Sequence, residues 1–291
     1  MPESSRTTKT QAFKKNGIIY QASRSYKYVL DAALSALSAR RVGYNGPICL
    51  FTNLDLPMPP PELISEIIQS GPVKKYASKW VTGKFPKLQA LQNSPYSRTL
   101  YIDTDTRILN AGIKDFPRLL FSADLLMVRV SPHNSFCAKA LNTDIYNAGV
   151  IAFKQTPTVM DLFSQWEAHT HKHHKLLEDT NLPSPEILAG ISDPKKRQKL
   201  LKMDQLGLYE LLNPQLNQTG VSFQEMGAVW NYRERTTVAL KETIIHHHNR
   251  YRKNQTAEAQ QAIQALQAEK HDAIALWLQK VLDLWQREKL S

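Results

Sequence analysis

The sequence predicts an α/β fold in which helices cover both faces of a mostly parallel central sheet. An apolar strand, a helix and a second apolar strand follow one another within residues 17–52, which is the β-α-β pattern of a parallel sheet. Later strand-like runs end in polar residues, as is typical where a ligand binds at the carboxyl edge of such a sheet. Residues 256–290 contain neither glycine nor proline and carry apolar residues at helical spacing, which predicts a C-terminal helical extension.

The predicted elements follow from local patterns in the chain. Residues 17–22 (GIIYQA) form a short strand, and residues 26–40 form a helix because their apolar residues recur at intervals of three and four. Two glycines then precede a second strand at residues 47–52, and prolines lead into a short helix at residues 62–69. Further along we expect helices at residues 85–92, 156–166 and 203–212, and strands at residues 98–102, 123–130 and 146–153.

These elements divide the chain into three regions. Residues 1–16 are predicted to be a disordered polar tail, residues 17–250 one large α/β domain, and residues 251–291 an amphipathic helical extension. Within the domain, the polar and charge-rich residues 167–202 indicate an insertion or lid. The apolar face of the extension has two open interpretations: it packs against its own domain or a sister subunit in a homo-oligomer, or it lies on a membrane surface.

The composition favours an anionic ligand. Among the 291 residues, 37 Lys and Arg against 26 Asp and Glu give a formal net charge of +11, which suits nucleotides, anionic lipid surfaces or nucleic acid. No nucleic-acid-binding module is recognisable, so nucleic acid is not expected. The two cysteines, Cys49 and Cys137, form no disulfide or metal-binding pattern. Without a membrane-spanning run or a secretory signal in residues 1–16, we expect a cytoplasmic protein, soluble or peripheral at a membrane surface.

The tripeptide Asp103-Thr104-Asp105 is the most informative motif. It directly follows the apolar run at residues 99–102, and residues two apart in an extended strand point to the same side. Mg²⁺ and Mn²⁺ are commonly held by one or two carboxylates together with substrate phosphates. The motif therefore predicts a cation site that a nucleotide diphosphate completes. Aspartates are also good turn formers, so a purely structural role stays open at this point.

Further motifs make the sequence similar to the GT-A glycosyltransferases, most closely to their glycogenin- and galactosyltransferase-like retaining branch. The resemblance covers residues 17–250 in order. The matching positions are Lys87 before the D-x-D, Asp103 and Asp105 as metal ligands, Tyr146-Asn147-Ala148-Gly149-Val150 for the (F/Y)-N-(A/S)-G-V strand, Asp204-Gln205 for the D-Q pair near the sugar, and Ile244-Ile245-His246 for the strand that carries a third metal ligand.

The resemblance implies the GT-A fold, a Rossmann-like α/β/α sandwich, and a hexosyltransferase-like enzyme of class EC 2.4. Such an enzyme transfers a sugar from a nucleotide-diphosphate donor, here expected to be a UDP-sugar, with retention of configuration. Asp103, Asp105 and His246 would bind Mn²⁺, or Mg²⁺, and an imidazole ligand favours Mn²⁺. Asp204 and Gln205 are the expected catalytic residues. The expected donor contacts are Ser23, Tyr26, Lys87, Thr104, Asn147, Gly149 and Lys253.

Some features depart from the family pattern. The family's H-x-x-G-x-x-K-P-W signature reads HHHNRYRK here, at residues 246–253, without the glycine and the final Pro-Trp. The acceptor, whether glycan, lipid or small molecule, is not predicted. Two alternatives remain: a sugar nucleotidyltransferase, although residues 21–25 lack its glycine-rich signature, and a non-catalytic nucleotide-sugar-binding scaffold.

Four histidines lie close together in the polar segment that follows the predicted helix at residues 156–166. They are His169, His171, His173 and His174. Because the segment is interpreted as a loop and offers no acidic or cysteine partner in pattern, we expect a solvated cluster or an adventitious site.

Overall fold

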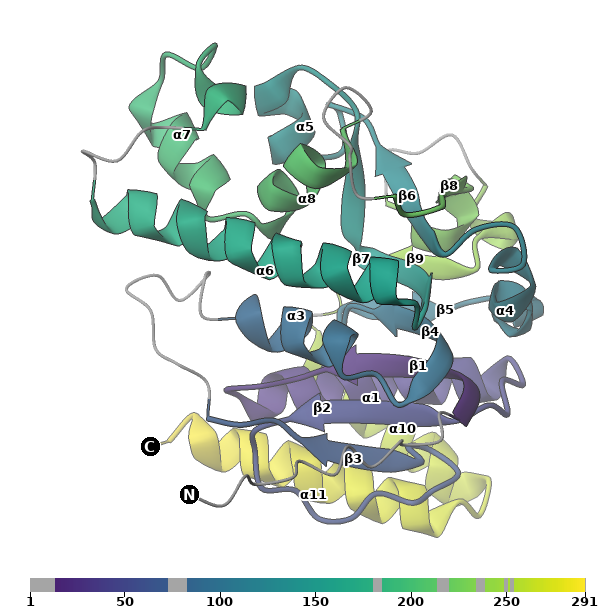
Figure 1. Ribbon diagram of the computed structural model, residues 1–291. Helices are drawn as coiled ribbons and strands as arrows, with labels where there is room; N and C mark the ends of the chain where they lie inside the picture. Colours follow the sequence, from purple (N-terminus) through teal and green to yellow (C-terminus); the bar gives the residue numbers. More distant parts are fainter. Residues whose placement is uncertain are drawn as a thin grey trace, which may run out of the picture.

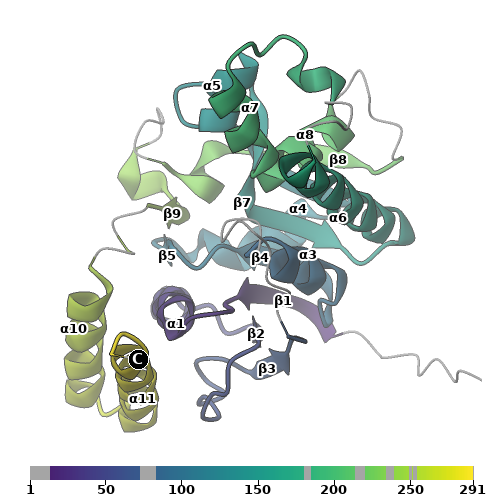
Figure 2. The same ribbon diagram turned by 90° about the vertical axis from the view of Figure 1, so that its left-hand side faces the viewer.

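The computed structural model describes residues 14–72, 83–179, 185–213, 220–233, 239–248, 251 and 254–290. A seven-stranded sheet with the strand order β3-β2-β1-β4-β7-β6-β8 lies between two layers of helices (Figures 1 and 2). β7 runs antiparallel to both of its neighbours, while the other neighbouring strands in this sheet run parallel. The expected α/β class with a mostly parallel central sheet is therefore confirmed.

The strands of the main sheet are β1 (Lys14–Gln21), β2 (Ile48–Thr52), β3 (Glu66–Gln69), β4 (Tyr96–Ile102), β6 (Leu125–Val130), β7 (Ile145–Lys154) and β8 (Phe223–Met226). Two short strands, β5 (Thr106–Ile108) and β9 (Ile245–His247), pair antiparallel in a second sheet. The prediction of a helix at residues 62–69 is wrong, because β3 pairs with β2 there. The adjacent β-branched residues Ile67 and Ile68 explain the preference for a strand. Of the predicted N-terminal tail, residues 1–13 lie outside the described residues and residues 14–16 belong to β1.

The α-helices are α1 (Tyr26–Arg41), α3 (Phe85–Gln92), α4 (Phe116–Leu119), α5 (Phe136–Leu141), α6 (Pro157–Glu178), α7 (Pro194–Leu201), α8 (Asp204–Leu212), α10 (Gln255–Ala268) and α11 (Asp272–Glu288). Short 3₁₀ turns are η1 (Ala111–Asp115), η2 (Glu186–Leu188), η3 (Ala228–Asn231) and η4 (Leu240–Glu242). Helix α1 packs on one face of the main sheet and is itself covered by α10 and α11, while α3, α6 and α8 lie on the other side (Figure 2).

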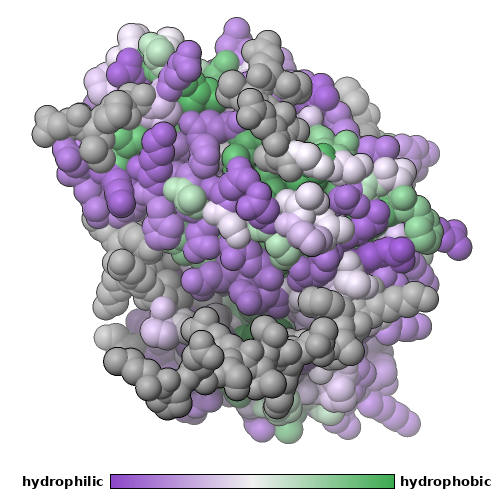
Figure 3. All heavy atoms as spheres, in the orientation of Figure 1, coloured by the Kyte–Doolittle hydropathy of each residue, from purple (hydrophilic) through white to green (hydrophobic). Residues whose placement is uncertain are grey.

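Helix α6 is much longer than the sequence suggested. It begins with Thr156 as its N-cap and Pro157 at the first helical position, a favourable start. It continues through Glu178 instead of ending at Trp166, so the first part of the expected insertion is helical. Its inner side buries Trp166, His173 and Leu176, while hydrophilic side chains predominate on the face of the molecule seen in Figure 3.

The C-terminal extension consists of α10 and α11 and packs on its own domain. The apolar face of α11 is buried against α1, and the Trp277 indole donates a hydrogen bond to the Pro57 carbonyl at 2.9 Å. At the end of α11, the Glu288 carboxylate accepts from the Ser25 hydroxyl at 2.7 Å and from the Tyr26 backbone N–H at 3.1 Å. The extension thus packs on its own domain, and neither the contact with a sister subunit nor the membrane contact is supported. In the described part of the chain, no helix combines the length and the hydrophobicity that a membrane crossing requires.

The topology brings several polar segments to one edge of the sheet. β1 and β4 run parallel with Ile19 beside Tyr101, so the residues that follow both strands emerge at their shared carboxyl edge. β7 runs in the opposite direction, with Val150 beside Ile102, and therefore delivers the residues at its beginning to the same edge. Ser23, Asp103 and Asn147 are placed close to one another in this way.

Candidate active site

A cavity of about 510 Å³ opens at this carboxyl edge. Five residues expected from the sequence line it, namely Ser23, Lys87, Asp103, Thr104 and Asp204. The other residues of its lining are Gln21, Arg24, Tyr28, Gly83, Lys84 and Tyr101. The lining is rich in charged side chains of both signs, which suits a polar ligand with its own charges.

The D-x-D motif is held in place by its own backbone and by Tyr101. The Asp103 backbone N–H donates to the Gly149 carbonyl at 2.8 Å, which ties the end of β4 to β7. The Tyr101 hydroxyl donates to the Asp103 carboxylate at 2.7 Å. Burial, followed by the nearby Asp103 carboxylate, raises the pKa of Tyr101 well above its ordinary value, so this donor keeps its proton. The Asp103 side chain stays 28% exposed, whereas that of Asp105 is buried.

The histidine next to these carboxylates is His247 and not the expected His246. The His247 Nε2 atom lies 3.3 Å from an Asp105 oxygen and 4.0 Å from an Asp103 oxygen. Neighbouring residues of a strand point to opposite sides, so His246 faces away, and its Nδ1 atom contacts the Tyr251 hydroxyl at 2.8 Å. The pairing of β9 with β5, in which His247 lies opposite Thr106, determines which histidine approaches the aspartates. The sequence match could not distinguish three consecutive histidines.

The hydrogen bonds behind His247 determine which of its ring nitrogens carries a proton. The Gly149 backbone N–H can only donate, so the Asn147 atom that it contacts at 2.8 Å is the amide oxygen. That oxygen also accepts from the Asn231 amide nitrogen at 2.8 Å, which turns the Asn231 oxygen toward His247 Nδ1 at 3.0 Å. Nδ1 must therefore donate, and a neutral His247 presents an unprotonated Nε2 to the two carboxylates.

This arrangement fits a divalent cation. Carboxylate oxygens and an unprotonated imidazole nitrogen are all acceptors, and their mutual repulsion is relieved when a cation lies between them. A hydrogen bond from the second ring nitrogen to a neighbouring oxygen is the usual way in which a metal-binding histidine is oriented. Gly149 makes the close packing possible, because a Cβ atom at this position would lie 2.5 Å from Cε1 of His247. Asp103, Asp105 and His247 thus form a candidate metal centre.

Two lysines and Asp204 also line the cavity. Asp204 is the first residue of α8, and its carboxylate accepts a short hydrogen bond from Lys84 and lies 3.6 Å from the Lys87 ammonium group. Burial alone would raise the pKa of Asp204, but the two lysines lower the pKa by more than burial raises it. The net shift is downward, so the carboxyl group is ionised. Lys87 is buried between Asp204 and Asp103, 3.4 Å from the latter, and donates to the Ala148 carbonyl.

The other expected residues take different positions. Asn147 is buried and uses its amide oxygen to support Asn231, so its role in the structure is to orient His247. Tyr26 directs its hydroxyl to the Asp55 carbonyl, and Tyr28, two residues further along α1, lines the cavity in its place. Gln205 is buried at the start of α8 and does not belong to the described residues that line the cavity. Lys253 lies outside the described residues.

Several residues of the site were not expected from the sequence. Lys84 precedes Lys87 by three positions, about one helical turn, and this spacing could have signalled a shared site. Arg24 has a φ of 77°, a conformation that costs a non-glycine residue energy and is frequent at functional sites. No sequence pattern indicated Arg24 or Asn231, because their roles depend on the tertiary structure.

No protein-family model matches the sequence, and no curated protein matches it either. Solved structures do resemble the fold. The glycosyltransferase GlyE from Streptococcus pneumoniae TIGR4 aligns with 94% of this chain at 14% sequence identity and a TM-score of 0.50, and this chain spans 65% of the length of GlyE. The galactosyltransferase LgtC, solved with donor and acceptor sugar analogues, aligns with 80% of this chain over 87% of its own length, at 14% identity and a TM-score of 0.43.

The GlyE match covers nearly the whole chain and agrees with the mixed seven-stranded sheet flanked by helices. An identity of 14% carries information about the fold and not about the substrate. The fold expected from the motifs is therefore confirmed: this chain has the fold of the GT-A glycosyltransferases.

Proposed function

We propose that this protein is a metal-dependent glycosyltransferase that uses a nucleotide-diphosphate sugar, in the first instance a UDP-sugar, as its donor. The observation that carries the proposal is the cluster of the Asp103 and Asp105 carboxylates with Nε2 of His247 at the carboxyl edge of the sheet. In open α/β sheets this edge is where ligands bind. The adjoining cavity of about 510 Å³ provides space for a ligand.

The charges of the site support a donor that binds together with a cation. The carboxylates of Asp103, Asp105 and Asp204 are balanced by three basic side chains at the cavity, Arg24, Lys84 and Lys87. A diphosphate diester carries roughly two negative charges, which a divalent cation would neutralise in an otherwise balanced site. Mn²⁺ is the preferred ion because one ligand is an imidazole, and Mg²⁺ is the second choice.

The protein residues have distinct tasks in this proposal. Asp103, Asp105 and His247 would hold the cation, which when bound supplies Lewis-acid stabilisation for a departing nucleotide diphosphate. Lys87 lies next to Asp103 and offers a positive charge to the diphosphate or to the donor sugar. Ser23, Arg24 and Tyr28 line the part of the cavity that follows β1, where we place the nucleoside.

Asp204 is the residue that we assign to the reacting sugar. Its ionised carboxylate faces the cavity and is fixed by Lys84 and Lys87, so it can stabilise positive charge at the anomeric carbon or orient the acceptor hydroxyl. Retention of configuration and a glycan, lipid or small-molecule acceptor complete the proposal. Gln205, buried beside Asp204, would act through the placement of α8.

Calorimetric titration with UDP, with and without Mn²⁺, tests this function. We expect metal-dependent binding that weakens by more than about 100-fold in Asp103→Asn/Asp105→Asn, because both carboxylate ligands lose their charge. Asp124→Asn is the matched control, since Asp124 pairs with Lys154 away from the cavity. Unchanged binding by the double variant would refute the metal site.

Hydrolysis of UDP- and GDP-sugars in the presence of Mn²⁺ is the second measurement. Slow release of a free sugar from one donor, abolished in the same double variant, is the expected result. Metal-dependent UDP binding without turnover of any donor would instead favour a non-catalytic nucleotide-sugar-binding protein.

A further inference from the structure

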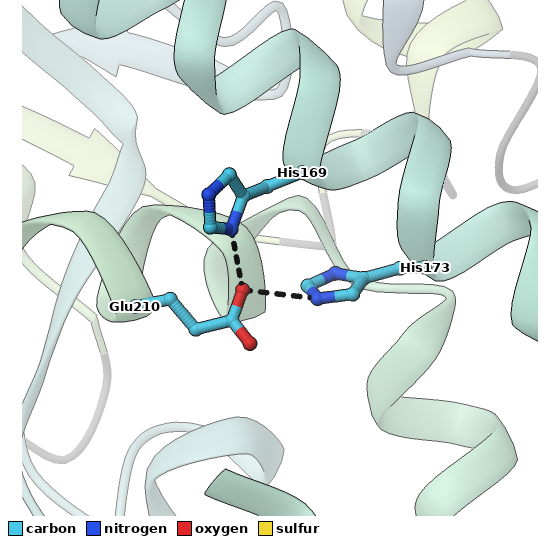
Figure 4. Close-up of side chains that lie close together, drawn as sticks. All are labelled: His169, His173 and Glu210. Atoms are coloured by element: carbon cyan, nitrogen blue, oxygen red, sulfur yellow. Dashed lines mark hydrogen bonds and ion pairs between the residues drawn. The ribbon is translucent and has the colours of Figure 1, made fainter. Parts of the chain in front are cut away.

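A second cluster of metal-ligand side chains lies between helices α6 and α8 (Figure 4). His169 and His173 are four residues apart on α6 and therefore project from the same side of the helix. Glu210 of α8 lies between them, with one carboxylate oxygen 2.7 Å from His169 Nδ1 and 3.0 Å from His173 Nε2. The three ligand atoms lie within 4.8 Å of one another.

The two histidines of this cluster differ in exposure: His169 is partly exposed and His173 is buried. His173 is 1% exposed, and within the described residues neither of its ring nitrogens has a hydrogen-bond partner. The 3.0 Å contact with Glu210 lacks hydrogen-bond geometry, so Nε2 points beside the carboxylate oxygen and not directly at it. A buried polar ring without a partner is costly, and a bound cation would supply the missing interaction.

The backbone is shaped to bring the two helices together at this point. Gly207 of α8 faces α6, and a Cβ atom at this position would lie 3.1 Å from Cβ of His169 and 3.4 Å from Cδ1 of Trp166. The absence of a side chain lets α8 approach closely enough for Glu210, one turn further along, to reach both histidines. The same contact carries a hydrogen bond of 2.8 Å from the Trp166 indole to the Asp204 carbonyl.

We propose that His169, His173 and Glu210 form a second divalent-cation site, suited to Zn²⁺ and separate from the Asp103, Asp105 and His247 cluster. Two imidazoles and one carboxylate are a ligand set that zinc favours, with water in the remaining position. The His169 side chain is 35% exposed, so an ion can enter from solvent. The candidate active site has the reverse ligand ratio, two carboxylates and one imidazole, which is better suited to Mn²⁺ or Mg²⁺.

The other two histidines of the segment do not take part. The His171 ring stacks on Phe85 with a centroid distance of 4.0 Å, and His174 lies 3.6 Å from the Glu178 carboxylate. The site is thus defined by the helical repeat and by Glu210 from a different helix. An ion bound there joins α6 to α8, and through α8 it fixes the position of Asp204 in the cavity.

Titration of the full chain with Zn²⁺ tests the proposal. The Asp103→Asn/Asp105→Asn variant serves as the background, so that the first cluster does not contribute and the result does not depend on the proposed function. We expect one equivalent of Zn²⁺ to bind, with a rise in the Tm. Co²⁺ should show the visible absorption of a low-coordinate nitrogen and oxygen site.

Matched histidine variants decide the assignment. His169→Gln and His173→Gln should each weaken Zn²⁺ binding by at least about tenfold, whereas His171→Gln, on the same helix, should not change it. His169 is the safer variant because its side chain is partly exposed, so its effect remains measurable if the His173 variant does not fold. Failure of the background variant to bind Zn²⁺, or equal binding by His169→Gln and His171→Gln, would overturn the proposal.

Discussion

The two ligand clusters of this protein are built on different secondary-structure elements. Asp103 and Asp105 lie in the turn between β4 and β5, and His247 is the last residue of β9. Their geometry depends on the pairing of β5 with β9, on backbone hydrogen bonds and on Asn231. His169, His173 and Glu210 come from two packed helices. The first cluster therefore depends on how strands are paired, and the second on how closely two helices approach. The comparison teaches that a sequence motif reveals the first kind of site more readily than the second.

The largest expected difference concerns the two neighbouring histidines of β9. His247→Ala removes a ligand of the first cluster, so we expect the Mn²⁺ affinity to fall by about 100-fold. His246→Ala should leave the Mn²⁺ affinity nearly unchanged and lower the Tm, because the His246 ring faces away from the aspartates and contacts Tyr251 and Tyr232. Calorimetry of both variants would reveal which histidine is the ligand. A larger loss of affinity in the His246 variant would restore the expectation from the sequence.

Substitution of each of the two glycines that permit close packing should affect only one of the two clusters. Gly149→Ala places a Cβ atom 2.5 Å from the His247 ring, so it should lower the free energy of unfolding by about 1–3 kcal/mol. Gly207→Ala places one 3.1 Å from Cβ of His169, and the higher helix propensity of alanine in α8 offsets the cost, so its effect on stability should be smaller. We expect the first to impair Mn²⁺ binding and the second Zn²⁺ binding. Gly190→Ala is the control, because no atom of the described residues lies within 4 Å of the added atom. If each variant weakened both ions equally, the clusters would not be independent.

A smaller effect is expected from Asn231, which orients His247 without facing the cation. Asn231→Ala removes the acceptor for the Nδ1 proton, and the Mn²⁺ affinity should fall by about tenfold. The ring would then be free to turn away from the carboxylates, so calorimetry should show the loss in Mn²⁺ affinity. A loss of stability with unchanged Mn²⁺ affinity would indicate a packing role only.

Much of the fold could be predicted from the sequence because its signals are local. The β-α-β start, the strand before Asp103 and the helix at residues 85–92 each have a periodicity that their environment reinforces. β3 could not be predicted in this way, because its four residues become a strand through pairing with β2. The second half of α6 has polar residues that resemble a loop, and only packing against α8 shows that they form a helix.

The candidate site could likewise be predicted only where its residues follow directly from a local motif. Asp103 and Lys87 lie where the motif suggested, since a strand end and a helix start place them directly. The register of β9 determines that His247 and not His246 lies beside the aspartates. The orientation of α1 determines that Tyr28 and not Tyr26 lines the cavity. Glu210 lies 41 residues after His169 in the chain, so no local pattern could identify it as the partner of the histidines.

The contact between Glu288 and the beginning of α1 has a consequence for biosynthesis. Ser25 and Glu288 are 263 residues apart, yet they are hydrogen-bonded at 2.7 Å. Because Ser25 is synthesised long before Glu288, this contact can form only after both segments are available. Contacts of such long range slow folding. The contact therefore couples the docking of α11 to the segment that carries Ser23 and Arg24 into the cavity wall.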